Sequence, residues 1–282
     1  MSLQRVLRHA LFSGVALCLA LGTLHAAADI IWPVKWSQLP KMDAYGYDWS
    51  SETSIGSMVA DDFLCSDPLP VTDLHWWGSY YDPGVLYPYT SSDNHPDPTI
   101  PAAGGDPEPP GILQGFNIEF YRDVPAGVDP LMPWSHPGTL LYEQCIPIGQ
   151  VTETYYGTVT RVGGMIEENV WQYNVLLSVP FQQDPLRDPV DVTGDGEPDG
   201  TIYWLKIQAV HCDTEIQWGW HEAETLWWDN AVQHWPPDAN SPDWDLLGDR
   251  DMAFELTVIP EPSVFLLAGL AGLGLLGRRR RR

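Results

Sequence analysis

Alternation of apolar and polar side chains is the feature of this sequence that most restricts its fold. In the run 171–179, apolar residues occupy every second position, and most of the positions between them are polar. Because successive side chains of a strand point to opposite faces, this run predicts a strand buried on one face. The predicted inward face holds Trp171, Tyr173, Val175, Leu177 and Val179.

Further strands are predicted along most of the chain, in runs rich in β-branched and aromatic residues. Outside the two ends, no window of a dozen residues has the apolar stripe of an amphipathic helix. We therefore expect an all-β fold, an antiparallel β-sandwich of jelly-roll type. The other predicted strands are 58–65, 72–78, 116–120, 139–146, 151–160, 201–211 and 252–258.

The segment 82–115 interrupts this pattern with a high density of Pro, Gly, Asp and Ser. It is either a linker between two domains or a long loop at one end of the sandwich. Two strands before it would not bury enough surface for a separate domain. We therefore expect a single β-sandwich ectodomain over residues 29–259.

The first 28 residues have the organisation of a secretory signal peptide. Arg5 and Arg8 precede an apolar run over 10–21, and three alanines at 26–28 offer a small-residue cleavage site before Asp29. This pattern predicts that the chain is exported.

The C-terminal segment 260–282 combines three features in a fixed order. Pro260, Glu261 and Pro262 are followed by an apolar run over 263–277 and then by five arginines. As a helix the run would be about 22 Å long, shorter than the roughly 30 Å hydrocarbon core of a bilayer. We expect a short membrane helix whose arginines, including Arg278, Arg279 and Arg280, stay cytoplasmic.

This combination resembles the PEP-CTERM sorting signal of Gram-negative bacteria. In that family a membrane enzyme, exosortase, recognises the tail and is thought to cleave near the Pro-Glu-Pro motif. The resemblance implies exosortase as a partner, transient anchoring in the inner membrane, and then location at the cell surface or in the extracellular matrix. It also implies that exopolysaccharide is nearby.

The region between the two ends is similar to an uncharacterised domain of other exported PEP-CTERM proteins. The resemblance is carried by short motifs spread over the ectodomain, and it implies one continuous domain without a known activity. These motifs are Lys35-Trp36-Ser37-Gln38, Ala60-Asp61-Asp62-Phe63-Leu64-Cys65, His75-Trp76-Trp77-Gly78, Ile202-Tyr203-Trp204-Leu205 and Trp228-Asp229-Asn230-Ala231-Val232.

Charge and cysteine content limit the possible partners. The net charge is −24, and all 38 acids lie between Asp29 and Glu261. Such a surface repels nucleic acid and attracts divalent cations, although acidity also serves solubility alone. Export permits disulfides, but three cysteines remain after the leader. Their spacing leaves Cys145–Cys212 and Cys65–Cys145 both open as a single pair.

An acidic, glycine-rich run at 191–199 resembles the calcium loops written DxDxDGxxD. Oxygen ligands at alternate positions can surround Ca²⁺, and Gly196 permits the sharp turn. The third position is Thr, and the bidentate Glu of an EF-hand is absent because Ile202 stands there. The alternative is a hairpin turn without a metal. The candidate calcium ligands are Asp191, Thr193, Asp195, Glu197 and Asp199.

Tryptophans cluster late in the chain, and they permit two interpretations. Exposed indole rings beside acids and amides hold sugar rings in many jelly rolls, whereas burial statistics favour a place in the core. If 217–221 is a strand, two of these tryptophans share a face, whereas adjacent Trp227 and Trp228 cannot both point inward. The candidate glycan-binding residues are Trp218, Trp220, Trp227 and Trp228.

No enzyme motif is strong enough to name a reaction. His221-Glu222 lacks a second His one turn later, so the HExxH zinc signature is missing. We find no serine nucleophile elbow and no phosphate loop. The favoured interpretation is a non-enzymatic surface or matrix protein that binds glycan and is stiffened by calcium. The alternatives are a polysaccharide hydrolase or lyase on the same fold, and a structural coat protein without a specific ligand.

Overall fold

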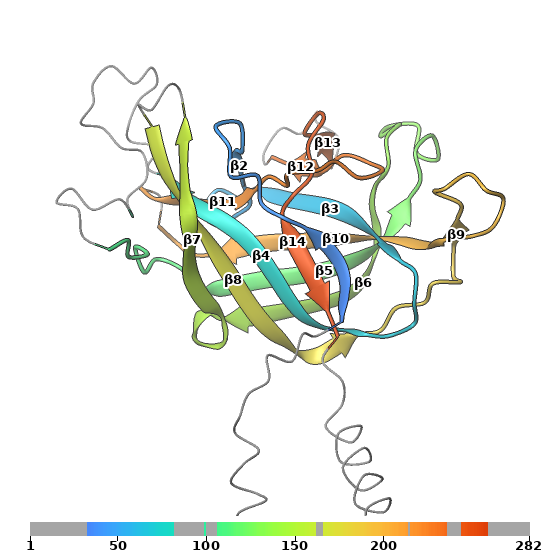
Figure 1. Cartoon of the computed structure of the whole chain (residues 1–282), viewed down its shortest axis with the longest axis horizontal. Helices are drawn as coiled ribbons and strands as arrows, with labels where there is room; N and C mark the ends of the chain where they lie inside the picture. The colour runs from blue at the N-terminus through green and yellow to red at the C-terminus, as the bar shows by residue number, and fades with distance from the viewer. Residues whose placement is uncertain are drawn as a thin grey trace, which may run out of the picture. The chain divides into compact units, whose positions relative to one another are not determined.

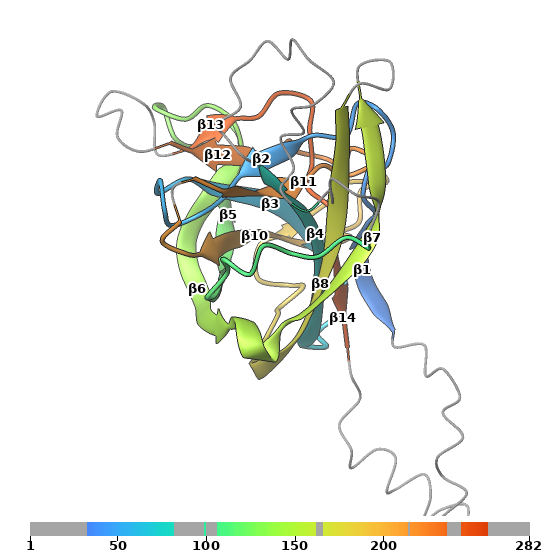
Figure 2. The same cartoon turned by 90° about the vertical axis from the view of Figure 1, so that its left-hand side faces the viewer.

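The computed structural model describes residues 33–81, 99, 106–161, 166–213, 215–235 and 244–258. Almost all regular structure in these residues is β-strand, arranged in two antiparallel sheets (Figure 1). Figure 2 shows the sheets as two layers, with β5, β6 and β10 on one side and β4, β7, β8 and β14 on the other. The predicted all-β sandwich of two antiparallel sheets is therefore confirmed.

The first sheet is organised around a long strand, β4, which pairs with β8 along one side and with β14 and β11 along the other. The short strand β2 forms the edge next to β11, and β7 forms the edge next to β8. The strands are β1 (Val34–Gln38), β2 (Asp48–Ser50), β4 (Val71–Tyr81), β7 (Thr152–Arg161), β8 (Ile166–Phe181), β11 (Gln217–His221) and β14 (Phe254–Thr257).

The second sheet has β10 near its centre, flanked by β3 and β5. Among the described strands, β5–β6 and β7–β8 form simple hairpins between long strands. Most of the other connections carry the chain from one sheet to the other. The strands are β3 (Met58–Cys65), β5 (Gly115–Val124), β6 (His136–Pro147), β9 (Pro189–Val190), β10 (Gly200–Val210), β12 (Val232–His234) and β13 (Asp245–Leu246), and one short 3₁₀ helix, η2 (Ile148–Gln150), follows β6.

The core between the sheets is rich in aromatic side chains. Phe116 of the second sheet lies 4.8 Å from Trp76, 5.2 Å from Tyr173 and 5.2 Å from Trp218 of the first sheet, measured between ring centroids. Each edge-to-face pair of this kind contributes about 0.5–1.5 kcal/mol beyond its burial. One phenylalanine thus joins three strands of the opposite layer.

A smaller apolar cluster covers the other face of the first sheet. It consists of Trp77, Val159, Val170 and Ala253, with Met42 packed against them. The loop between β1 and β2, which carries Met42, therefore lies against this outer face and helps to shape the site described below.

The strand predicted over 171–179 is part of β8, and four of the five predicted inward residues are buried. Val179 is the exception, because 63% of it is exposed. The pairing of β8 with β4 changes register between Leu176 and Phe181, so the alternation does not continue to the strand end. The prediction that Val179 faces the core is wrong for this reason.

Several predicted segments lie outside the described residues. These are the signal peptide over 1–28, the membrane helix over 263–277 and most of the loop 82–115. Among the residues that are described, no helix is long and apolar enough to cross a bilayer. The three ectodomain cysteines are free thiols: Cys65 is buried, and Cys145 and Cys212 are exposed.

Candidate functional site

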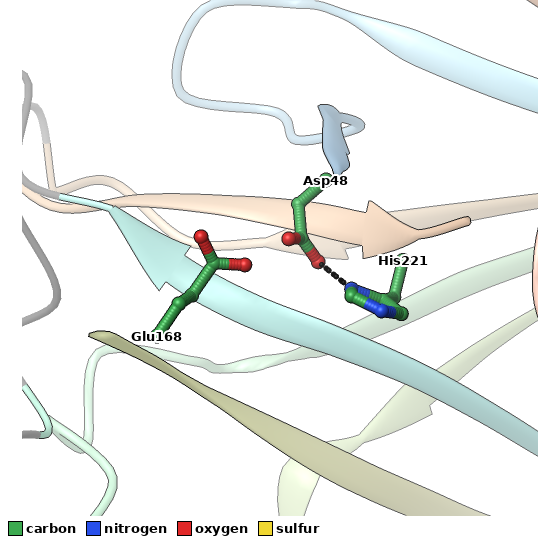
Figure 3. A group of neighbouring side chains, drawn as sticks. All are labelled: Asp48, Glu168 and His221. Carbon is green, nitrogen blue, oxygen red and sulfur yellow. Dashed lines mark hydrogen bonds and ion pairs between the residues drawn. The ribbon is translucent and has the colours of Figure 1, made fainter. Parts of the chain in front are cut away.

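Three potential metal ligands from three strands meet on the outer face of the first sheet. They are Asp48 of β2, Glu168 of β8 and His221 of β11, and each offers one ligand atom within 4.8 Å of the other two. In Figure 3 the two carboxylates point toward each other, with the imidazole beside Asp48. In the part of the chain that the structure describes, no other group of three His, Cys, Asp or Glu side chains meets this criterion.

Strand alternation directs these side chains away from the main core. Trp49 and Trp220, which pair with each other across β2 and β11, pack into the core between the sheets. Their neighbours Asp48 and His221 form the next cross-strand pair, so they face the opposite side. Glu168 shares its face with Val170 of the outer cluster.

Two glycines allow the backbone to approach this group closely. A Cβ atom on Gly219 would lie 2.8 Å from the Cβ of Asp48. A Cβ on Gly46 would lie 1.9 Å from the carbonyl oxygen of Lys41 and 3.1 Å from Nε2 of His221. Any larger residue at either position would push apart the loop and the strand that hold the imidazole.

Hydrogen bonds fix the orientation of the imidazole. Nδ1 of His221 lies 2.9 Å from Oδ1 of Asp48, and Nε2 lies 3.0 Å from the carbonyl oxygen of Lys41. A carbonyl oxygen only accepts, so Nε2 carries a proton and donates it. Nδ1 therefore faces the carboxylates. A carboxylate oxygen also only accepts, so the contact of Nδ1 with Oδ1 of Asp48 is a hydrogen bond only when Nδ1 is protonated too. On the other side of the group, the hydroxyl of Ser79 donates to Oε1 of Glu168 at 3.0 Å.

A second group of acidic side chains is buried inside the protein. Asp61 and Asp251 are almost completely inaccessible, and the amide of Gln38 donates to both carboxylates. Burial raises the pKa of Asp61 well above its usual value, with the charge of Asp251 as the next cause. Burial also raises the pKa of Asp251, to about 7. Both acids hold protons more tightly than exposed aspartates do.

Among the described residues, neither carboxylate oxygen of the aspartate next to Asp61 has a hydrogen-bond partner, although this aspartate is fully buried. Burial raises the pKa of this residue, Asp62, well above its usual value, with the charge of Asp61 as the next largest cause. Since Asp61 and Asp62 are adjacent on β3, they point to opposite faces.

Exposed aromatic side chains lie on the segments before β2 and after β11. Trp228 is 55% exposed, and its backbone φ of 52° lies in the left-handed region that bulky residues rarely adopt. The neighbouring Trp227 packs edge-on against Trp36, with ring centroids 4.5 Å apart. The guanidinium of Arg250 lies 5.5 Å from the ring centroid of Tyr47.

The four predicted glycan-binding tryptophans differ in their exposure to solvent. Trp218 and Trp220 are completely buried, and their indole N–H groups donate to the hydroxyl of Tyr173 and to the carbonyl of Ala253. Their ring faces pack in the core and do not meet solvent. The interpretation of these two as glycan-binding residues is corrected to a core role, whereas Trp228 is exposed.

The predicted calcium loop is closed by its own hydrogen bonds. The carboxylate of Asp191 accepts from the backbone N–H groups of Gly194, Asp195 and Gly196, which hold its pKa below the usual value, Gly196 foremost. Asp199 accepts from the N–H groups of Val192 and Thr193. These hydrogen bonds give the loop a defined turn between β9 and β10, and calcium binding by Asp191, Thr193, Asp195, Glu197 and Asp199 stays a prediction.

Comparison with known families covers both the ectodomain and the tail. Residues 34–257 match a family described as Domain of unknown function (DUF7901). The chain belongs to the DUF7901 family. Residues 258–282 match the PEP-CTERM protein-sorting motif, which contains the predicted Pro260-Glu261-Pro262 and the arginines from Arg278 onward. No curated protein and no solved structure is significantly similar to this DUF7901 protein.

The sorting motif indicates how this DUF7901 protein is exported and processed. A PEP-CTERM tail marks an exported protein that is anchored by its C-terminal segment until exosortase processes it at the membrane. The tail itself lies outside the described residues. Both resemblances expected from the sequence, to PEP-CTERM proteins and to an uncharacterised exported domain, are confirmed.

Proposed function

We propose that this DUF7901 protein is a non-catalytic component of the surface or extracellular matrix of a Gram-negative bacterium, and that it binds exopolysaccharide through the aromatic surface around Trp228. The observation that carries the proposal is the exposure of Trp228 on a left-handed backbone. Such a conformation costs about 1–3 kcal/mol, and the inference runs from this strained position to a function.

The surroundings of Trp228 hold it in this conformation. The backbone N–H of Trp227 donates to the carboxylate of Asp251, and the N–H of Ala231 donates to the carbonyl of Arg250 at 2.8 Å. The segment is therefore fixed on both sides of the exposed ring. A rigid exposed indole loses little conformational entropy when it binds a ligand.

The chemistry of this edge suits a sugar ring. The faces of pyranose rings stack on aromatic side chains, and planar polar groups bind the hydroxyls. Arg250 lies over the rings of Tyr47 and Trp49 and forms an ion pair with Glu222, which also accepts from the indole N–H of Trp49. Aromatic rings and polar groups thus lie together around Arg250, and Trp228 is joined to this region through Trp227, with ring centroids 6.4 Å apart.

Calcium is the second part of the proposal. Extracellular calcium sites are weak, with dissociation constants of about 10⁻⁴–10⁻³ M, and the exposed carboxylates of Asp195 and Glu197 lie in the loop that resembles such sites. A bound ion would stiffen the loop between β9 and β10.

Retention on immobilised polysaccharide tests the proposal. The full-length chain, in mild detergent, is applied to acidic and neutral exopolysaccharides with either 10 mM CaCl₂ or EDTA. We expect retention that weakens about 3- to 10-fold in Trp228→Ala, the range of one aromatic stacking contact. Trp235→Ala is the matched control, because Trp235 is also half exposed, at 48%.

Two results would contradict the glycan proposal. The first is a lack of retention on every polysaccharide under both conditions. The second is equal retention of the wild type and Trp228→Ala. If calcium and EDTA give the same retention and the same melting temperature, the calcium part is wrong.

A further inference from the structure

We propose that Asp48, Glu168 and His221 bind one divalent transition-metal ion of the first row, such as Zn²⁺. This site is independent of glycan binding, because its side chains lie on the outer face of the first sheet, whereas Trp49 on the same strand packs toward the core. Three features of these side chains support the proposal: the spacing of the ligand atoms, the orientation of the imidazole, and the charge of the group.

The ligand atoms are close to the spacing that a metal requires. Metal–ligand distances of 2.0–2.2 Å in a tetrahedral or facial arrangement place the ligand atoms about 3 Å apart. Oδ1 of Asp48 and Nδ1 of His221 are 2.9 Å apart. One carboxylate oxygen of Glu168 lies within 4.8 Å of a ligand atom of each of the other two residues, so a small movement of this side chain would complete the set.

The imidazole is oriented as it is in most protein metal sites. A metal-binding histidine usually donates its other ring N–H to a backbone carbonyl or a carboxylate. In this protein Nε2 of His221 donates to the carbonyl of Lys41, and Nδ1 faces Oδ1 of Asp48, where a metal ion would take the place of the proton that the two atoms can share. The hydroxyl of Ser79 plays the corresponding part for Glu168, since it donates to Oε1 and orients that carboxylate.

The charge and donor types select the class of ion. Two carboxylates that face each other repel, and a divalent cation removes this repulsion. A nitrogen and two carboxylates suit zinc and its first-row neighbours, whereas calcium takes six to eight oxygen ligands. The ion would link the three-residue edge strand β2 to β8 and β11, so binding stabilises the fold.

Titration of the metal alone tests the site. The tag-free, full-length chain in mild detergent is stripped with EDTA and titrated with ZnCl₂ by calorimetry. We expect one ion per chain, bound at least about tenfold more weakly in Glu168→Gln and Asp48→Asn, because even changes to groups behind the ligands cost 10–100-fold. At 100 times the dissociation constant, zinc should raise the melting temperature by about 5 °C or more.

Glu167→Gln is the matched control. It removes the same charge from the adjacent position of β8, where the side chain is exposed on the opposite face. Its zinc affinity should equal that of the wild type. Equal affinity of the wild type and Glu168→Gln, or several weak ions that excess CaCl₂ displaces, would overturn the proposal, since either result indicates binding to the general acidic surface.

If the variants fail to fold, X-ray absorption of the zinc-loaded wild type tests whether Asp48, Glu168 and His221 bind the ion. A first shell of one nitrogen and otherwise oxygen, near 2.0–2.1 Å, supports the site. A shell that contains sulfur or several imidazoles, or no bound zinc after dialysis, would overturn it.

Discussion

At the scale of single residues, the buried acids couple the stability of the fold to pH. Asp61 and Asp251 face each other across the amide of Gln38, away from water. Burial raises the pKa of each in the folded state, whereas an unfolded aspartate titrates near 3.9. The folded protein therefore binds more protons than the unfolded chain between these two values.

The resulting prediction concerns Asp251→Asn. The contribution of Asp251 to stability is complete below pH of about 4 and is lost as pH rises toward its folded pKa of about 7. Asparagine mimics the protonated acid. Between pH 5 and pH 8, the free energy of unfolding should therefore fall by about 2 kcal/mol less in the variant than in the wild type. Urea unfolding at both pH values measures this difference, and parallel losses in the two proteins would refute it.

Gly78 shows a residue whose role the sequence only partly indicates. It ends the motif His75-Trp76-Trp77-Gly78 that marks the resemblance to exported domains. In the structure, a Cβ there would lie 2.4 Å from the ring of Trp218 and 2.5 Å from the carbonyl oxygen of Gly219. The motif thus reflects packing of β4 against β11, which only the paired strands reveal.

At the scale of strands, a buried ion pair ties β10 to β5. Lys206 and Glu119 stand directly opposite each other, and both are more than 90% buried, with Nζ 2.5 Å from Oε1. Removing one partner of such a pair leaves an uncompensated buried charge, whereas replacing both is often nearly neutral.

Lys206→Met should therefore lower the free energy of unfolding by about 3–5 kcal/mol. The double variant Lys206→Met/Glu119→Gln should regain most of this loss, because the remaining glutamine is neutral. A double-mutant cycle by urea unfolding measures both effects. If the double variant is as unstable as Lys206→Met alone, the buried charge is not the cause.

The long strands were largely predictable because each is a run rich in β-branched and aromatic residues, and part of β8 also alternates between apolar and polar residues. The run 58–65 coincides with β3, and 201–211 nearly coincides with β10. The short strands β2, β12 and β13 were not predicted, since two or three residues carry no period. Val179 was misplaced because a register change depends on the partner strand, which the sequence of β8 does not contain.

The candidate metal group could not be predicted for a similar reason. Asp48 and His221 are 173 residues apart in the sequence and become a cross-strand pair only because β2 joins β11. The only available signal was His221-Glu222, which attracts attention as half of an HExxH motif. The loop at 191–199 differs in this respect, because hydrogen bonds between residues at most seven positions apart determine its form.

At the scale of the whole molecule, the two ends of the chain determine where the ectodomain acts. The PEP-CTERM motif over 258–282 marks an exported protein that exosortase processes. The predicted signal peptide over 1–28 agrees with that direction. We therefore expect the acidic β-sandwich to function outside the cytoplasm.

Mass spectrometry of the termini, in host cells with and without exosortase, tests the central claim most directly. With exosortase, the protein should be released from the membrane, begin near Asp29 and lack the arginines from Arg278 onward. Without exosortase, it should stay in the inner membrane with those arginines attached. Recovery of the same full-length chain from the cytosol of both strains would contradict the account.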